Sequence, residues 1–141
     1  IAGILDGEGC IGIDKIKSPH KVWPFDFKIR VVITNTNENI ICWLKTTVGS
    51  GCAYISQKKP FKSNWRVVHR WQIVSEQARE FLTQVRPYLK IKGEVCDLVM
   101  QLPKLPTSRK FTGRTNLEYE EQTKFYNMAK LKNTRGLAIF K

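Results

Sequence analysis

The chain has 141 residues, 42% hydrophobic and 26% charged, so it is long enough for one packed domain and too apolar for wholesale disorder. Its 24 Lys and Arg residues against 12 Asp and Glu give a formal net charge of +12, which favours a polyanionic partner, most commonly nucleic acid. Because an anionic membrane surface or a ribosomal site would suit the same charge, the charge alone does not decide among these partners.

Cysteine usage and hydropathy narrow the class of protein further. The four Cys residues are too sparse for a disulfide scaffold, and none forms a C-x-x-C pair or lies at metal-ligand spacing from a His. No run approaches the ~18 uninterrupted apolar residues that a membrane span needs, and the N-terminus carries no signal-peptide pattern. We therefore expect reduced thiols, no zinc site, no membrane partner and an intracellular location, in the cytoplasm or in an organelle.

The first part of the chain reads as a short helix, two strands and a second helix. Residues 1–7 resemble the end of a helix that glycines break, and residues 10–17 alternate apolar and polar side chains as a half-buried strand does. Residues 25–34 continue this alternation and predict a longer strand. Asn37 and its neighbours offer N-cap residues for a helix that Gly49 closes.

The next part reads as two strands followed by two helices. Residues 51–58 and 65–74 have strand-like patterns, and a basic turn joins them. Ser75 is placed to cap a helix that stops at Pro87, and a further helix ends at Pro103.

The last part is a basic connector over residues 103–114 and a helix over about residues 116–133, for which Thr115-x-x-Glu118 forms a capping box. The order of elements is α–β–β–α–β–β–α–α–α. Four strands with the helices grouped on one side predict a single domain of the α+β class over residues 1–141. The other face of the sheet is left to solvent or to a ligand.

The opening segment IAGILDGEG (residues 1–9) carries the densest chemical signal. Ala2 and Gly3 are small and share a helical face, so another backbone could approach them closely. Asp6 and Glu8 lie where the helix ends, and two such ends side by side would need a divalent cation such as Mg²⁺ to neutralise their charges. Taken without context, so short a motif is more commonly an ordinary helix C-terminus with a glycine cap.

These residues closely resemble the LAGLIDADG motif of the homing endonucleases, with Ile1 for the first Leu, Gly7 for Ala and Glu8 for the second Asp. The resemblance extends to the order of elements and to the run FLTQVRPYLKIK (residues 81–92), and it covers about residues 1–102. The basic loop and helix of residues 103–141 carry no signature of the family. The resemblance implies an αββαββα core, in which a four-stranded antiparallel sheet forms a DNA-binding saddle and helices pack on its other face.

The resemblance also implies the catalytic and metal-binding residues. By position in the motif, Glu8 binds a divalent metal, with the carbonyl of Gly7 beside it. Asn35 holds the place of a polar residue that orders water, and Lys92 fits the lysine that stabilises charge near the scissile phosphate, with Lys90 as a nearby competitor. The implied reaction is phosphodiester hydrolysis with Mg²⁺, for which Mn²⁺ or Ca²⁺ can stand in, and without a small-molecule cofactor.

A single motif supplies one carboxylate, so a complete site requires two chains. The resemblance implies a homodimer whose motif helices pack through Ala2 and Gly3, with Asp6 tying each helix to its surroundings. Because such a dimer has two-fold symmetry, its DNA site is expected to be long and pseudo-palindromic.

The open face of the sheet is expected to lie in the major groove of double-stranded DNA. The residues assigned to it by face are Asp14, Asp26, Lys28, Arg30, Thr34, Gln57, Arg66, Arg70 and Gln72. Lys58 and Lys59, in the turn between the last two strands, are expected to contact phosphates, as is the basic connector. Any single lysine is explained as well by a solvated surface, so the alternating set carries the assignment.

The function expected from these observations is that of a site-specific, intron-encoded DNA endonuclease. The main alternative is an RNA maturase or a non-cleaving nucleic-acid-binding protein of the same fold. A basic ribosomal or RNA-packaging protein would explain the charge but would leave the motif as a coincidence.

Overall fold

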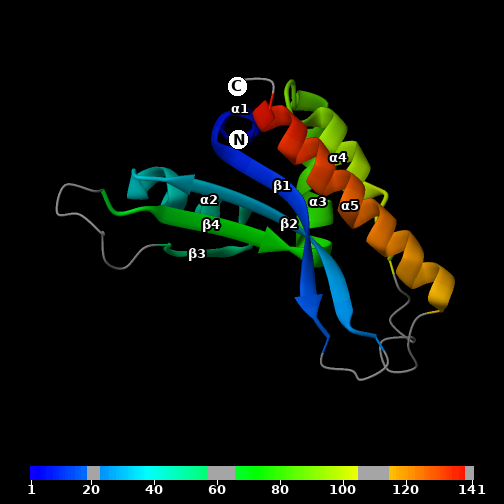
Figure 1. The fold of residues 1–141 in the computed structure, drawn as a ribbon. Helices are drawn as coiled ribbons and strands as arrows, with labels where there is room; N and C mark the ends of the chain where they lie inside the picture. Colours follow the sequence, from blue (N-terminus) through cyan, green and yellow to red (C-terminus); the bar gives the residue numbers. More distant parts are fainter. Residues whose placement is uncertain (19–22, 57–65, 105–114, 139–141) are drawn as a thin grey trace.

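The computed structural model describes residues 1–18, 23–56, 66–104 and 115–138, which form an α+β fold (Figure 1). The first elements are α1 (Ala2–Glu8), β1 (Gly9–Lys17), β2 (Phe25–Asn35), α2 (Glu38–Val48), β3 (Cys52–Ile55) and β4 (His69–Val74). The chain continues with α3 (Ser75–Val85), the 3-10 turn η1 (Arg86–Tyr88), α4 (Gly93–Met100) and α5 (Asn116–Ala138). The order of elements predicted from the sequence is confirmed.

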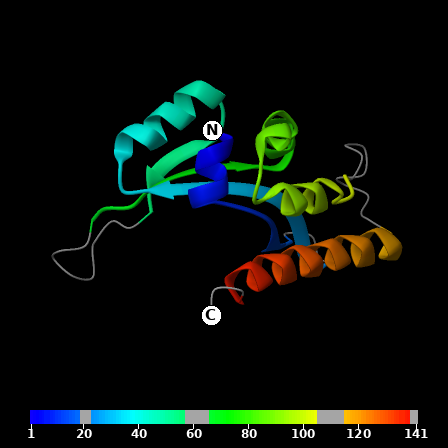
Figure 2. The ribbon, with the colours of Figure 1, turned by 90° about the horizontal axis from the view of Figure 1, so that it is seen from above.

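The four strands form one sheet in the order β1-β2-β4-β3, and every neighbouring pair is antiparallel. Helices α2 and α3 lie together on one side of this sheet (Figure 2). On β2, β4 pairs with residues 30–35 and not with the first half of the strand. That first half, paired with β1, extends past the end of β4 and bends away from the rest of the sheet (Figure 1). The predicted α+β sheet with helices on one face is therefore confirmed.

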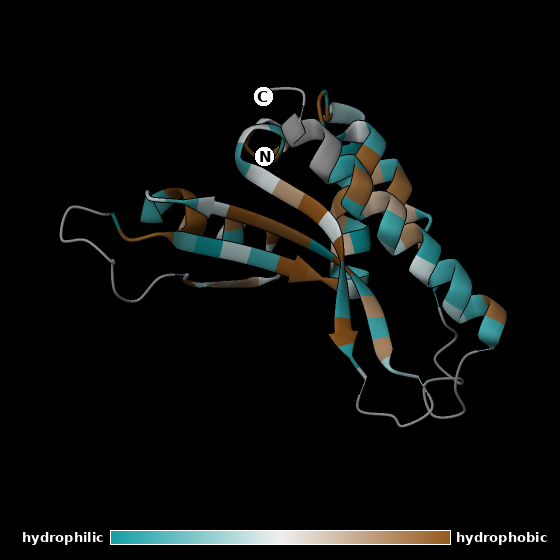
Figure 3. Ribbon diagram, in the orientation of Figure 1, coloured by the Kyte–Doolittle hydropathy of each residue, from teal (hydrophilic) through white to brown (hydrophobic). Residues whose placement is uncertain are grey.

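The core forms because side chains alternate along each strand. Ile29, Val31 and Ile33 are at most 1% exposed, and the fully buried Trp71 lies opposite Ile33 on β4. Hydrophobic and hydrophilic residues follow one another along the extended part of β2 (Figure 3). Because every second residue turns to the helices, one apolar core forms, and it includes Leu5 of α1.

Helix α5 covers the extended part of β1 and β2, which no other described strand reaches. The ring of Phe27 lies 5.9 Å from that of Tyr119 and 5.7 Å from that of Tyr126. Trp23 stacks on Tyr119 with 5.0 Å between ring centroids. These aromatic contacts fix the place of α5 on the sheet, although α5 lies outside the residues 1–102 that the family resemblance covers.

The predicted helix caps are confirmed at two of three positions. The side chain of Asn37 accepts the backbone N–H of Asn39 at 3.0 Å, and Thr115 and Glu118 exchange hydrogen bonds of 2.8 and 3.2 Å as a capping box does. Ser75 makes no cap, because the N-cap position falls one residue earlier and the Ser75 hydroxyl already lies inside the first turn.

Several boundaries also differ from the prediction. β3 ends at Ile55 and β4 begins at His69, while α5 runs to Ala138, because residue alternation and apolar periodicity do not reveal where backbone pairing stops. Helix α3 ends at Val85, and Pro87 lies inside η1. Over the described residues, no helix combines the length and the apolarity needed to cross a membrane.

Candidate active site and nucleic-acid interface

Helix α1 is anchored to the fold on one side and open on the other. Leu5 is fully buried, and at about 100° per residue Gly3 and Gly7 lie on the opposite side. Both glycines are exposed, and a Cβ added at either would meet nothing within 4 Å. Ala2, also predicted for the dimer contact, is half-buried and packs against the core of its own chain. The open side of α1 is formed by Gly3 together with Gly7.

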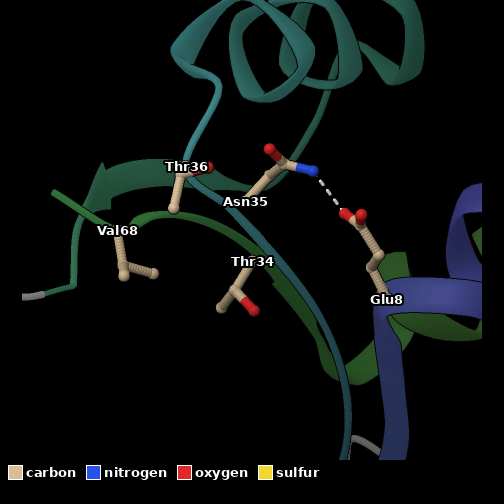
Figure 4. Close-up of a pocket in the computed structure, with 5 residues that line it drawn as sticks. All are labelled: Glu8, Thr34, Asn35, Thr36 and Val68. Atoms are coloured by element: carbon tan, nitrogen blue, oxygen red, sulfur yellow. Dashed lines mark hydrogen bonds between the residues drawn. The ribbon is translucent and has the colours of Figure 1, made fainter. Parts of the chain in front are cut away.

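Two of the three residues predicted to be catalytic are in direct contact. Glu8 is the last residue of α1 and Asn35 the last of β2, and the Asn35 side-chain amide donates a hydrogen bond to the Glu8 carboxylate (Figure 4). Asn35 Oδ1 also accepts the backbone N–H of Asn37 at 2.7 Å, so the start of α2 orients this amide. An open hollow of about 310 Å³ lies here, lined by Glu8, Thr34, Asn35, Thr36 and Val68.

The third residue, Lys92, reaches α1 through Asp6. The two carboxylate oxygens of Asp6 accept the backbone N–H groups of Lys90 at 2.7 Å and of Lys92 at 2.9 Å. The ammonium group of Lys92 donates to the backbone carbonyl of Asp6. Desolvation acts to raise the pKa of the Asp6 carboxyl, but the N–H donors of Lys90, Lys92 and Ile91 and the Lys92 charge outweigh it, so the pKa lies below its usual value.

The oxygen atoms at the end of α1 suit a hard divalent cation. Glu8 and Gly7 are both exposed, and carboxylate and carbonyl oxygens are the ligands that Mg²⁺ and Ca²⁺ prefer. In the part of the chain that the structure describes, no three His, Cys, Asp or Glu residues form a group able to hold a metal. The donors present therefore fit a cation that takes its other ligands from water, phosphate or a second chain.

Strand register brings most of the predicted DNA-binding residues onto one face of the sheet. Pairing places Lys28 opposite Asp14, Thr34 opposite Arg70, and Val32 opposite Gln72. The residues on this open face include Asp14, Asp26, Lys28, Arg30, Thr34, Arg70 and Gln72, while their strand neighbours turn to the core. These seven residues therefore share the face that α2 and α3 leave uncovered.

Arg66 does not belong to this set. Arg66 is exposed but precedes β4, so strand alternation assigns it no face. The prediction that placed Arg66 inside a strand is wrong because β4 begins at His69. Gln57, Lys58 and Lys59 lie outside the described residues.

Side-chain contacts hold several groups of the open face in place. Arg30 forms an ion pair with Asp14 at 3.0 Å. Tyr54 donates a hydrogen bond to Gln72 Oε1 at 3.2 Å, and the guanidinium of Arg70 lies 6.0 Å from the centre of the Tyr54 ring. Sequence reasoning missed Tyr54, because it read residues 51–58 as one strand with Gln57 on the open face, and alternation from Gln57 puts Tyr54 on the other face. The register opposite Arg70 reveals the face on which Tyr54 lies.

Comparison with known proteins places this fold in a defined class. No family model matches the chain, and no curated protein matches it. Solved structures do match, and the fold of the chain is that of the LAGLIDADG homing endonucleases. The resemblance inferred from residues 1–9 is therefore confirmed at the level of the fold.

Several of the solved structures that resemble this chain were determined with DNA. The homing endonuclease I-CvuI, crystallised with DNA targets in the presence of Mg²⁺ or Ca²⁺, has a TM-score of 0.72 and 19% identity, over 92% of this chain and 77% of its own. The archaeal intron-encoded I-Vdi141I, complexed with DNA, has a TM-score of 0.70 and 11% identity, over 92% and 79%. I-LtrWI, a LAGLIDADG homing endonuclease bound to target DNA, has a TM-score of 0.64 and 12% identity, over 89% and 41%.

Proposed function

We propose that the protein is a LAGLIDADG homing endonuclease, an intron-encoded enzyme that cleaves both strands of DNA at a specific site and requires a divalent cation such as Mg²⁺. The observation that carries this proposal is the contact between Glu8 and Asn35 at the edge of an uncovered sheet face. An acidic residue that ends the motif helix then lies beside a fixed amide and next to a row of charged side chains. The likeness of the fold to DNA-bound homing endonucleases supports the same reading.

The open side of α1 supports a homodimer. Gly3 and Gly7 would let a second backbone approach closely, and Tyr88 and Ile91, on the neighbouring turn, are 70% and 75% exposed. A two-fold axis beside α1 would bring the Glu8 side chains of two chains to one place, and one cleavage site would serve each strand of the duplex. The second acidic residue that a single motif lacks would then come from the partner chain.

The residues of each chain would divide the work of hydrolysis. Glu8 and the carbonyl of Gly7 would hold the cation, which when bound supplies Lewis acidity toward the scissile phosphate and lowers the pKa of the attacking water. Asn35, oriented by the backbone of Asn37, would fix the direction of a water molecule beside Glu8. The ammonium of Lys92 would add positive charge where negative charge builds up on the phosphate.

The uncovered face of the sheet would lie in the major groove. Arg30 and Lys28 present donors suited to the acceptors of guanine, and Gln72 has an amide of the kind that pairs with adenine. The net charge of +12 would add a sequence-independent attraction to phosphates that weakens as salt is raised.

A cleavage assay with Glu8→Gln tests this proposal. The substrate is the gene that hosts the intron, with the intron deleted, incubated with protein and Mg²⁺. Gln keeps the shape of Glu8 and an oxygen that can accept the Asn35 amide, but it removes the charge, so we expect DNA affinity to stay within about threefold and cleavage to fall by at least about 10³-fold.

Glu38→Gln is the matched control, because Glu38 is an exposed carboxylate in the first turn of α2 and makes the same change of charge. We expect it to cleave at the wild-type rate. Undiminished cleavage by Glu8→Gln would remove Glu8 from the site. A wild-type protein that binds structured intron RNA and cuts no DNA in Mg²⁺ would favour an RNA maturase instead.

A further inference from the structure

Asp6 holds Lys92 both at its backbone N–H and at the tip of its side chain. Its Oδ1 accepts the backbone N–H of Lys92 at 2.9 Å, and its own backbone carbonyl accepts the Lys92 ammonium. A lysine side chain has several rotatable bonds, so contacts at its backbone and at its tip remove much of its conformational freedom. Asp6 thereby fixes the direction of this cation relative to α1.

The turn that carries Lys92 has little other support. Lys90 and Ile91 are exposed, and burial resumes only at Leu89 on one side and Gly93 on the other. The second carboxylate oxygen of Asp6 accepts the N–H of Lys90 at 2.7 Å, so both oxygens of one side chain clamp residues 90–92. Lys92 also stands at the N-cap of α4, which means that any shift of this turn would carry Lys92 with it.

We propose that Asp6 is a positioning residue, which clamps residues 90–92 onto the end of α1 and thereby sets the Lys92 ammonium against the backbone of α1, two residues before Glu8. This inference rests on the proposed function, because it takes from that function the part of Lys92 in cleavage. Both carboxylate oxygens of Asp6 are used inside the protein, so Asp6 acts through Lys92 and not on the DNA.

A double-mutant cycle with Asp6→Asn and Lys92→Ala tests this role. Asn keeps one oxygen acceptor but turns an NH₂ group toward the other backbone N–H, which breaks one half of the clamp. In single turnover, with protein and Mg²⁺ saturating, we expect Asp6→Asn to slow cleavage by about 10²-fold, the usual cost of a small misplacement of a reacting group. In the Lys92→Ala background the same substitution should cost less than about twofold, because its target is gone.

Asp97→Asn is the matched control. Asp97 holds Arg86 of η1 through two hydrogen bonds of 2.6 Å, so it fastens the same region of the chain with the same chemical group but touches neither α1 nor Lys92. We expect Asp97→Asn to cleave within about twofold of wild type, with unchanged affinity for DNA. If Asp6→Asn fails to fold by circular dichroism, Asp6→Glu, which keeps the carboxylate and moves it by one methylene, replaces it in the cycle.

A second measurement does not depend on cleavage. A small activated ester acylates exposed lysine amines, and mass spectrometry reports the rate at each site. In the wild type, Lys92 should react several-fold more slowly than Lys90, since the Asp6 carbonyl holds its ammonium. In Asp6→Asn the carbonyl remains but the side-chain clamp on residues 90–92 is weakened, so that difference in rate should shrink by at least about threefold.

The outcomes separate this inference from the function on which it rests. Three results would overturn the positioning role. The first is that Asp6→Asn slows cleavage equally with and without Lys92. The others are a parallel loss of DNA affinity and an unchanged acylation rate at Lys92. A wild-type protein that cleaves no DNA would refute the proposed function, and the acylation rates would still decide whether Asp6 places Lys92.

Discussion

Replacing Gly3 or Gly7 with alanine should stabilise the folded monomer but weaken the dimer. Within one chain a Cβ at either position meets nothing within 4 Å, and both positions lie inside a helix. Each substitution should therefore stabilise the folded monomer by about 0.5–1 kcal/mol, the usual gain of alanine over glycine in a helix.

The same methyl groups should weaken a dimer in which two copies of α1 meet. A methyl forced into a closely packed contact costs about 1–3 kcal/mol. Because a two-fold interface contains every residue twice, either substitution should cost about 2–6 kcal/mol of dimerisation free energy. This corresponds to a dissociation constant about 30-fold to 10⁴-fold higher.

Sedimentation velocity over a range of protein concentrations measures the dissociation constant, and urea unfolding at a concentration where the variants are monomeric measures the fold. Thr47→Ala, at an exposed position of α2, is the control that raises helix propensity without touching α1. Gly9→Ala should do the reverse of Gly3→Ala and destabilise the monomer, because its Cβ would lie 2.7 Å from the backbone oxygen of Leu5. Gly3→Ala and Gly7→Ala dimers as tight as wild type, or a stable monomer on DNA, would refute the shared interface.

Two further predictions concern the open face and the C-terminal end of α4. Arg30→Ala should relax sequence preference at one or two base pairs by about 1–3 kcal/mol, measured by competition among DNA variants. The control Lys45→Ala, on α2, should leave that preference unchanged. The reverse pattern would contradict the assignment of faces. Arg79 of α3 donates hydrogen bonds to the backbone carbonyls of Met100 and Leu102. Arg79→Met should therefore lower the free energy of unfolding, measured by urea titration, by about 1–2 kcal/mol. A change below about 0.3 kcal/mol would show that water replaces these hydrogen bonds without loss of stability.

Local patterns in the sequence were sufficient for the order of elements. The alternation of residues 25–34 identified β2 and its two faces, and Asn37 and Thr115 marked helix starts that the structure confirms. These signals are readable because period and capping act within a few residues of one another. Ends of strands escaped prediction, as at His69, because the alternation continues where the pairing partner does not.

The candidate site was predicted in part, through the motif. Glu8 and Asn35 were chosen from their positions in a resemblance, and the structure places them in contact across 27 residues of sequence; their catalytic roles stay predictions. Tyr54 was missed, and its place on the open face follows only from its pairing with Arg70.

The sequence by itself determined the strand and helix periods, the excess of positive charge and the acidic residue that ends the first helix. Only the tertiary structure decided that Gly3 and Gly7 form the open side of α1, and that Asp6 clamps Lys90 and Lys92 from 84 and 86 residues away. The physical reason is that helix and strand patterns depend on neighbouring residues, whereas such contacts depend on how the packing of Leu5 into the core orients α1.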